Sequence, residues 1–418
     1  MYRFCLFRYG RRIQSATDRQ ASVSRYKPLP NSARPWIAAT SVRTLFPVLL
    51  AACLTATAHA APTSLPVESS HIEKLDAPSA HWVFVIDLVG HAARLFDGDD
   101  GRMLGMVATT PSTMALEWTP DRSELLFAAA YYTRHTYGDR TDAVVSYDVP
   151  TLSPIGETLL PGGPPKLANG YPIRAYSGIF DGGRFMAVYN FSPATSLSII
   201  DTRTRTHLAD IATVGCGLVF PVNADTALQL CGDGTVQRIQ LATDGKTAAM
   251  KRSVRLFDPG TDPFMDKAAR DGTAWWFITF TGSLVRVDGV TLQADAAWPV
   301  QQESERSGWR PGGRMPIALH RKQQQLFILM HEGGVDTHKQ DGSEVWVFDV
   351  ATKKRTEKII LKSAASSIDI SQDDDPLLFA VNADRSLDVY SANSGKYLRS
   401  IAGVGIAPVI VQSFNPGY

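Results

Sequence analysis

MPIALHRKQQQLFILMHEGGVDTHKQDGSEVWVFDVATKKRTEKIIL, residues Met315–Leu361, reads as one complete four-stranded β unit. Its apolar runs MPIALH, LFILMH, EVWVFDV and TEKIIL are short, rich in Ile, Val, Leu, Phe and Trp, and separated by polar or Gly-containing turns. Short and partly alternating runs of this kind are typical of β-strands rather than helices. A sheet this small cannot cover both of its faces, so the chain should contain further copies of the unit.

The third strand of the unit, which ends in Asp or a substitute before a turn, recurs along the chain. The recurring strands are VFVID, VVSYD, LSIID, VQRIQL, LVRVD, VWVFD and LDVYS, which end at Asp87, Asp148, Asp201, Leu241, Asp288, Asp349 and Ser391. Successive ends lie 40 to 61 residues apart. Four strands per unit at such a period predict an all-β fold, a seven-bladed β-propeller with four antiparallel strands per blade.

The two ends of the repeat region are each incomplete. The run PVIVQSF near the C-terminus has no third strand after it, and the first copy at Trp82 has little strand-forming sequence before it. We therefore expect the C-terminal run to complete the first blade and close the ring. The same strands could also build a β-sandwich or a linear solenoid.

Composition indicates an ordinary globular protein preceded by a leader. The 418 residues are 44% hydrophobic and 20% charged, and a β fold of this size often forms one domain. Residues 1–60 hold nine Lys and Arg against one acid, then an apolar run and Ala58-His59-Ala60. This pattern predicts a basic leader and secretory signal peptide over 1–60, and a single propeller domain over 61–418 in the periplasm.

Two features leave the details of the leader open. Leu50-Ala51-Ala52-Cys53 also resembles a lipoprotein cleavage box, which would leave Cys53 acylated, and translation could start near residue 36. The apolar run is too short and broken to predict a lasting membrane span. Without residues 1–60 the formal charge falls from +1 to −7, and no basic stripe predicts nucleic-acid binding.

Two cysteines remain beyond the leader, Cys216 and Cys231. Two thiols in an oxidising compartment favour a disulfide. The segment CGLVFPV, a bend at Asn223-Ala224 and the segment DTALQLC predict a hairpin that places the two cysteines opposite each other, within disulfide reach. Two buried free thiols are the alternative.

The sequence contains few groups that could catalyse a reaction. It has no G-x-S-x-G elbow, phosphate loop, C-x-x-C pair or H-E-x-x-H motif. His331 and His338 flank a Gly-rich loop whose length fixes no ligand geometry, so we interpret them as solvated loop histidines. We expect no catalytic, cofactor-binding or metal-ligating residue in this chain.

The aromatic segment 128–148 is the best candidate site. It places Tyr131, Tyr132, His135 and Tyr137 in what the sequence suggests is a long loop between two strands. Exposed aromatic side chains on a rigid frame are typical of partner and substrate surfaces. The same rings could instead pack beneath the loop.

Five segments follow one another along the chain: Tyr132 with Arg134 and GDRTDAVVSYD, then Asn190–Asp201, Gly215–Gly234, Gly308–Gly313 and Leu329–Asp349. In this order they resemble the heavy (large) chain of the tryptophan tryptophylquinone-dependent amine dehydrogenases, the aromatic amine and methylamine dehydrogenase family. The resemblance runs from about Trp82 to Phe414 and looks closer to the aromatic amine enzyme.

The resemblance implies a periplasmic α2β2 heterotetramer that converts primary amines to aldehydes and ammonia. The quinone would lie on a separate small (light) chain, and electrons would pass to a blue-copper acceptor of the amicyanin or azurin type. This chain would be the scaffold and one wall of the substrate channel, inactive alone, with Tyr132 where methylamine dehydrogenase has a Phe. The pair Cys216 and Cys231 matches a disulfide of the family.

Two other functions are compatible with the repeats. A periplasmic propeller that only binds or scaffolds a partner would need no small chain. A metal-dependent propeller hydrolase would need a ring of Glu, Asn and Asp at the central channel, and the repeats suggest no such set.

Overall fold

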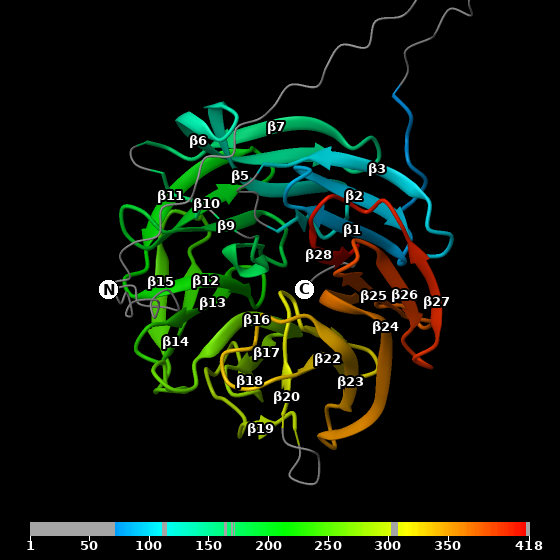
Figure 1. The fold of residues 1–418 in the computed structure, drawn as a ribbon. Helices are drawn as coiled ribbons and strands as arrows, with labels where there is room; N and C mark the ends of the chain where they lie inside the picture. The colour runs from blue at the N-terminus through cyan, green and yellow to red at the C-terminus, as the bar shows by residue number, and fades with distance from the viewer. Residues whose placement is uncertain are drawn as a thin grey trace, which may run out of the picture. The chain divides into compact units, whose positions relative to one another are not determined.

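The structure, a computed structural model, describes residues 72–110, 115–162, 165–168, 170, 172–301 and 308–414. Within these residues the chain is almost entirely β-strand, with one short 3-10 helix, η1 (Arg174–Tyr176). Hydrogen bonding groups the strands into six antiparallel sheets, which Figure 1 shows around a common centre. The all-β propeller predicted from the repeats is therefore confirmed.

Five of the sheets have four strands each. The first contains β28 (Pro408–Ser413), β1 (Trp82–Asp87), β2 (Ala92–Asp97) and β3 (Met103–Ala108). The second contains β4 (Glu117–Trp118), β5 (Glu124–Arg134), β6 (Tyr137–Asp148) and β7 (Ser153–Leu159). The third contains β8 (Ser177–Ile179), β9 (Phe185–Asn190), β10 (Ser196–Asp201) and β11 (Thr206–Ala212).

The fourth sheet contains β12 (Cys216–Pro221), β13 (Thr226–Cys231), β14 (Val236–Leu241) and β15 (Ala248–Arg252). The fifth contains β16 (Phe264–Asp271), β17 (Ala274–Thr279), β18 (Ser283–Asp288) and β19 (Trp298–Pro299). The sixth contains β20 (Trp309–Pro311), β21 (Ile317–His320), β22 (Gln325–Glu332), β23 (Gly342–Asp349), β24 (Lys354–Ile370), β25 (Leu377–Asn382), β26 (Leu387–Ser391) and β27 (Tyr397–Ile401).

The prediction of seven blades is wrong, because the described residues form five four-stranded blades and one continuous eight-stranded sheet. The strand responsible is β24, which runs for 17 residues without Gly or Pro. Its first half pairs with β23, from Lys354 to Ile360, and its second half pairs with β25, from Ala365 to Ile370. The two repeats at this end of the sequence therefore merge, because no turn residue interrupts the strand that they share.

Pairing of the two ends of the described chain closes the ring. Strand β28 pairs with β1 from Ser413 opposite Val83 to Pro408 opposite Asp87, and Figure 1 shows the red C-terminal strand beside the blue first strand. The carboxylate of Asp87 accepts hydrogen bonds from the backbone N–H groups of Ile406 and Ala407 at 2.8 and 2.9 Å. Burial alone would raise the pKa of Asp87, but these bonds, with those from Gly90 and Arg94, lower it to about 2.

Aromatic side chains pack the first sheet against the second. Phe84 of β1 lies on Trp118 of β4, with ring centroids 6.3 Å apart, and Trp118 lies 5.1 Å from Phe414, which follows β28. Phe84 and Phe414 are fully buried. Replacing one such ring by Ala typically costs about 3–5 kcal/mol, so this contact reinforces the closure of the ring.

Cys216 and Cys231 are joined by a disulfide with an S–S distance of 2.07 Å. The two residues lie directly opposite each other on β12 and β13, in the register that the hairpin sequence predicts. A bulge between Gly217 and Phe220, with Leu218 at φ +69°, shifts the register of the remaining pairs. The predicted signal peptide, its cleavage after Ala60 and the lipidation of Cys53 all lie outside the described residues. Among the described residues, no helix is long and apolar enough to cross a membrane.

Candidate functional site

The aromatic segment is a long β-hairpin rather than the loop suggested by its sequence. Strands β5 and β6 stay paired up to Arg134 opposite Tyr137, so that His135, at φ +63°, and Thr136 form the turn. The Tyr and Thr residues that suggested a surface loop are also good strand formers, and here they extend the ladder. The alternating directions of strand side chains place Tyr131 and Tyr132 on opposite faces of the hairpin.

The four candidate side chains differ in exposure. Tyr137 and Tyr131 are 59% and 38% exposed, His135 is exposed, and Tyr132 is half-buried. Desolvation raises the pKa of Tyr131 to about 12, so its phenol stays neutral at ordinary pH. Exposed rings at the hairpin tip and a partly covered phenol below them fit a contact surface.

Arg140 connects Tyr132 to the rest of the blade. Its Nε and Nη2 donate to the carboxylate of Asp142 at 2.6 and 3.2 Å, and its Nη1 donates to the Tyr132 hydroxyl at 3.4 Å. The guanidinium carbon also lies 5.7 Å from the Tyr132 ring centroid. A planar guanidinium with two bonds to one carboxylate is held rigidly, and it fixes the side of the phenol that it contacts.

Arg140 and Asp142 also bind the segment that follows the second sheet. Nη2 of Arg140 donates to the carbonyl of Leu167 at 2.6 Å, while Asp142 accepts from the backbone N–H groups of Lys166 and Leu167 at 2.7 and 2.9 Å. The ammonium of Lys166, which is buried, forms an ion pair with Asp210 on β11. Burial opposes ionisation of Asp210, but the bonds from Lys166, Ser198 and His207 lower its pKa. The sequence did not predict this network because residues that bond to each other in it lie up to 44 residues apart.

A cavity lies among the inner strands β4, β8, β12 and β16. Its wall is mostly apolar and includes the carboxyl of Glu117, which is buried. Burial raises the pKa of Glu117 to about 8, although Ser177 donates to it at 3.1 Å and Arg174 lies nearby. A Glu inside the apolar run MALEW is a weak indication of this group in the sequence.

The structure places His331 and His338 in different surroundings. The described residues contain no group of three or more His, Cys, Asp or Glu side chains placed to hold a metal ion. His331 is only 3% exposed, and its Nε2 lies 2.8 Å from Thr337 Oγ1, so the solvated position expected for it is wrong. The ring of His338 lies edge-on to Phe280 at 5.1 Å. Burial lowers the pKa of both imidazoles.

Sequence comparison gives the same family over nearly the whole described chain. The family model described as methylamine dehydrogenase heavy chain matches residues 79–415. The methylamine dehydrogenase heavy chain of Paracoccus versutus is 30% identical over 352 residues, covering 81% of this chain and 80% of its own length. The corresponding chain of Methylorubrum extorquens is 27% identical over 350 residues, covering 80% and 83%.

Comparison of folds gives more distant similarities. Dihydro-heme d1 dehydrogenase NirN superposes with a TM-score of 0.52 at 15% identity, covering 82% of this chain and 77% of its own. A functionally unknown protein from Desulfotomaculum acetoxidans superposes with a TM-score of 0.55 at 13% identity, covering 81% and 100%. At such low identity these similarities concern the fold alone.

We predict that Asp142→Ala destabilises the protein by about 3 kcal/mol, because it leaves the guanidinium of Arg140 buried without its carboxylate. Urea unfolding measures this change, and hydrogen exchange should rise in peptides covering residues 165–168, whose N–H groups Asp142 binds. Asp139→Ala, at an exposed position on the same strand, is the matched control. Equal effects of the two substitutions would contradict the assigned role of Asp142.

Proposed function

The chain belongs to the methylamine dehydrogenase heavy-chain family and is thus a subunit of an amine dehydrogenase, and we propose how it acts in that enzyme. It is the scaffold for a light chain that carries tryptophan tryptophylquinone, in a periplasmic α2β2 heterotetramer. Primary amines are oxidised to aldehyde and ammonia at the quinone of the light chain. The observation that carries the proposal is the match of one family model to residues 79–415, from before β1 to beyond β28.

The composition of the chain supports a scaffold role for it and a quinone on the light chain. Beyond the leader the sequence has two cysteines, which form the disulfide of the fourth sheet, and it has no recognisable nucleophile or metal motif. A disulfide is typical of exported proteins, which supports the periplasm. Electrons then pass from the quinone to a blue-copper protein.

Tyr132 lines the substrate channel in this proposal. Its phenol is half-buried, and its hydroxyl accepts a hydrogen bond from Arg140. A hydroxyl in an otherwise apolar part of the substrate channel favours amines that can hydrogen-bond to it and disfavours those that cannot. Tyr132 therefore acts on amine selectivity rather than on the chemical step.

The light chain docks on one end of the ring. Because antiparallel strands alternate in direction, successive turns of each blade lie at opposite ends of the ring. Six large apolar side chains that are at least half exposed lie in or directly beside the turns and loops of the end that carries the aromatic hairpin, namely Val89, Tyr137, Val214, Val254, Val335 and Ile406. Among the described residues, the turns of the opposite end carry one exposed large apolar side chain, Val290.

Three of these apolar side chains form the docking patch beside Tyr132, namely Val89, Ile406 and Tyr137. Val89 and Ile406 lie together because the backbone N–H of each donates to Asp87, at 3.2 and 2.8 Å. The ring contact of His91 with His135, at 5.4 Å, brings this turn beside the tip of the hairpin that carries Tyr137. An exposed apolar patch with aromatic residues is typical of a protein interface.

Purification of the tagged chain from its native periplasm, with mass analysis and an absorption spectrum, tests the proposed function. We expect a co-purifying small chain with a cross-linked Trp quinone that a primary amine bleaches, and a panel of amines then identifies the substrate. A lone, colourless chain from an extract that oxidises no amine would contradict the proposal and favour a binding scaffold.

We predict that Tyr132→Phe raises the preference for an apolar amine over a hydroxyl-bearing amine of the same size by about tenfold, since the substitution removes one hydrogen-bonding group. Steady-state kcat/KM values of the assembled enzyme for butylamine and 3-aminopropanol give this ratio. Tyr397→Phe, on the outer strand β27, is the control. A ratio that changes no more than in this control would exclude Tyr132 from the channel while leaving the enzyme assignment intact.

A further inference from the structure

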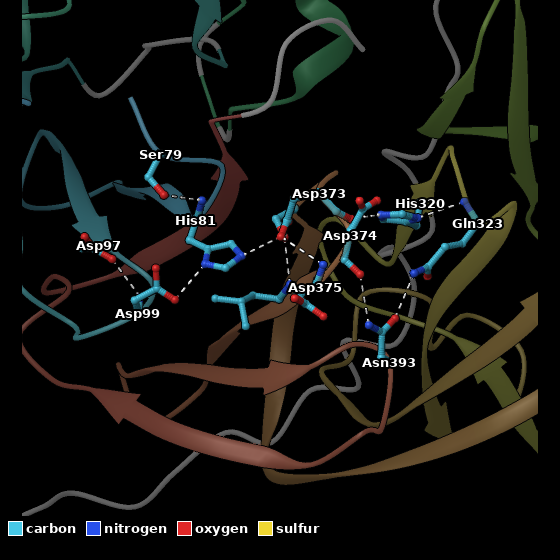
Figure 2. Close-up of polar contacts among 12 residues, drawn as sticks. Ser79, His81, Asp97, Asp99, His320, Gln323, Asp373, Asp374, Asp375 and Asn393 are labelled. Carbon is cyan, nitrogen blue, oxygen red and sulfur yellow. Dashed lines mark hydrogen bonds and ion pairs between the residues drawn. The ribbon is translucent and has the colours of Figure 1, made fainter. Parts of the chain in front are cut away.

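His81 joins two parts of the ring that are far apart in sequence. It directly precedes β1, and its backbone carbonyl accepts from Gly98 N–H at 2.9 Å in the turn between β2 and β3. Its Nδ1 lies 2.7 Å from a carboxylate oxygen of Asp99 in that turn. Its Nε2 lies 3.0 Å from a carboxylate oxygen of Asp373, in the turn between β24 and β25 of the eight-stranded sheet (Figure 2).

This geometry requires a charged imidazole. Both ring nitrogens of His81 face carboxylate oxygens, which at neutral pH are acceptors only. A neutral imidazole has one N–H, so one of its nitrogens would direct a lone pair at a carboxylate, whereas imidazolium donates to both. Nearby His320 has the opposite arrangement, because its Nδ1 accepts from Gln323 N–H at 3.1 Å and its Nε2 donates to the Asp373 carbonyl at 2.9 Å.

The carboxylate of Asp373 is held in place by its own turn. Ser371 Oγ donates to one oxygen at 2.6 Å, and the backbone N–H of Asp375 donates to the other, the oxygen that His81 contacts, at 3.2 Å. The His81 side chain is 17% exposed, against 27% for Asp373 and 61% for Asp99. Solvent therefore screens the bond to Asp373 less than the bond to Asp99. The bond to Asp373 is also the one that connects two different sheets.

The charged groups around His81 are mostly acidic. The turn between β2 and β3 contributes Asp97, Asp99 and Asp100, and the turn between β24 and β25 contributes Asp373, Asp374 and Asp375. On the basic side, Lys322 forms an ion pair with Asp374, Arg102 one with Asp100, and Arg399 donates to the carbonyl of Gly98. Burial tends to lower the pKa of His81, but the hydrogen bonds and charges of Asp99 and Asp373 outweigh it and raise the pKa above 6.5.

We infer that His81 is a proton-dependent clasp that fastens the first sheet to the eight-stranded sheet and is closed when the imidazole is charged. The pairing of β28 with β1 closes the first sheet itself, whereas His81 links that sheet to its neighbour. Because folding raises the pKa of His81, the clasp stabilises the folded protein fully at pH values below the unfolded pKa of about 6.5. This stabilisation is lost as the pH rises through the pKa of His81 in the folded protein, so alkaline pH loosens the contact between the two sheets.

The protonation of His81 is measured directly in the assembled wild-type enzyme. Exchange of the imidazole C2 hydrogen with deuterium, followed by mass spectrometry across a pH series, gives the titration midpoint of each histidine. We expect a midpoint above 6.5 for His81 and below 6.5 for His320, for which burial lowers the pKa. A His81 midpoint at or below 6.5 would overturn the inference, and this measurement needs no variant that might fail to fold.

The clasp itself is tested with His81→Gln and the control His207→Gln. His207 has a similar side-chain exposure, 16%, and contacts the single carboxylate of Asp210 within its own sheet. Backbone hydrogen exchange is compared between variant and wild type at equal pH, one unit below and two units above the measured His81 midpoint. In peptides covering residues 371–376, His81→Gln should speed exchange about threefold to tenfold at the lower pH and by less than twofold at the higher pH.

Two results would overturn the clasp. An acceleration of the same size at both pH values would mean that His81 only fills space at the seam. The second result is that His207→Gln speeds hydrogen exchange in residues 371–376 as much as His81→Gln does. That result would mean that the contact between the two sheets responds to any change in stability. Neither result depends on the proposed light chain or on amine oxidation.

Discussion

The pairing of β28 with β1 is the interaction on which the rest of the structure depends. Each blade buries its faces against its neighbours, so an open ring would expose the first and last sheets to water. The closing strand is held along its hydrogen-bonded ladder from Pro408 to Ser413, by Asp87 at one end and by the packing of Phe414 on Trp118 at the other. Asp87 accepts N–H groups from both sides of the seam, which explains why a carboxylate is retained in a buried position.

Closure also fixes the relative positions of the loops. The hairpin of β5 and β6 projects from the blade next to the seam, and its tip touches the turn of the first blade through His135 and His91. The loop before β28 and the turn after β1 share Asp87. The docking patch is thus assembled from segments more than 300 residues apart, and it exists only when the ring is closed. This relation connects the stability of the fold with its proposed role as a scaffold.

The sequence predicted the elements of this fold better than it predicted their boundaries. Alternating apolar runs and the recurring Asp at the ends of strands located most strands, and the missing partner of Trp82 predicted the closing strand. The merged sheet was not predicted, because the repeats ending at Asp349 and Ser391 were counted as separate blades, whereas no Gly or Pro ends the strand β24 that joins them. The aromatic segment was expected to form a long loop between two strands, whereas strand pairing continues to Arg134 and Tyr137.

Contacts between distant residues could not be predicted from one sequence. The hairpin at Cys216 and Cys231 was predictable because both cysteines belong to one local unit with a fixed register. The bonds from Asp142 to Lys166 and from His81 to Asp373 depend on how blades meet, which no local pattern encodes. The raised pKa of Glu117 could not be predicted either, because it depends on burial in a cavity whose walls come from several blades.

In the proposed complex the closed ring presents the end with Val89 and Ile406 to the light chain. Capture of the light chain by the tagged chain carrying Val89→Lys with Ile406→Lys, compared with Val290→Lys at the opposite end, tests this arrangement. These three side chains are 56%, 56% and 49% exposed, so none of the substitutions disturbs the core. We predict at least a tenfold loss of captured light chain in the first protein and none in the second. Unchanged capture in the first protein, or a greater loss in the second, would contradict it.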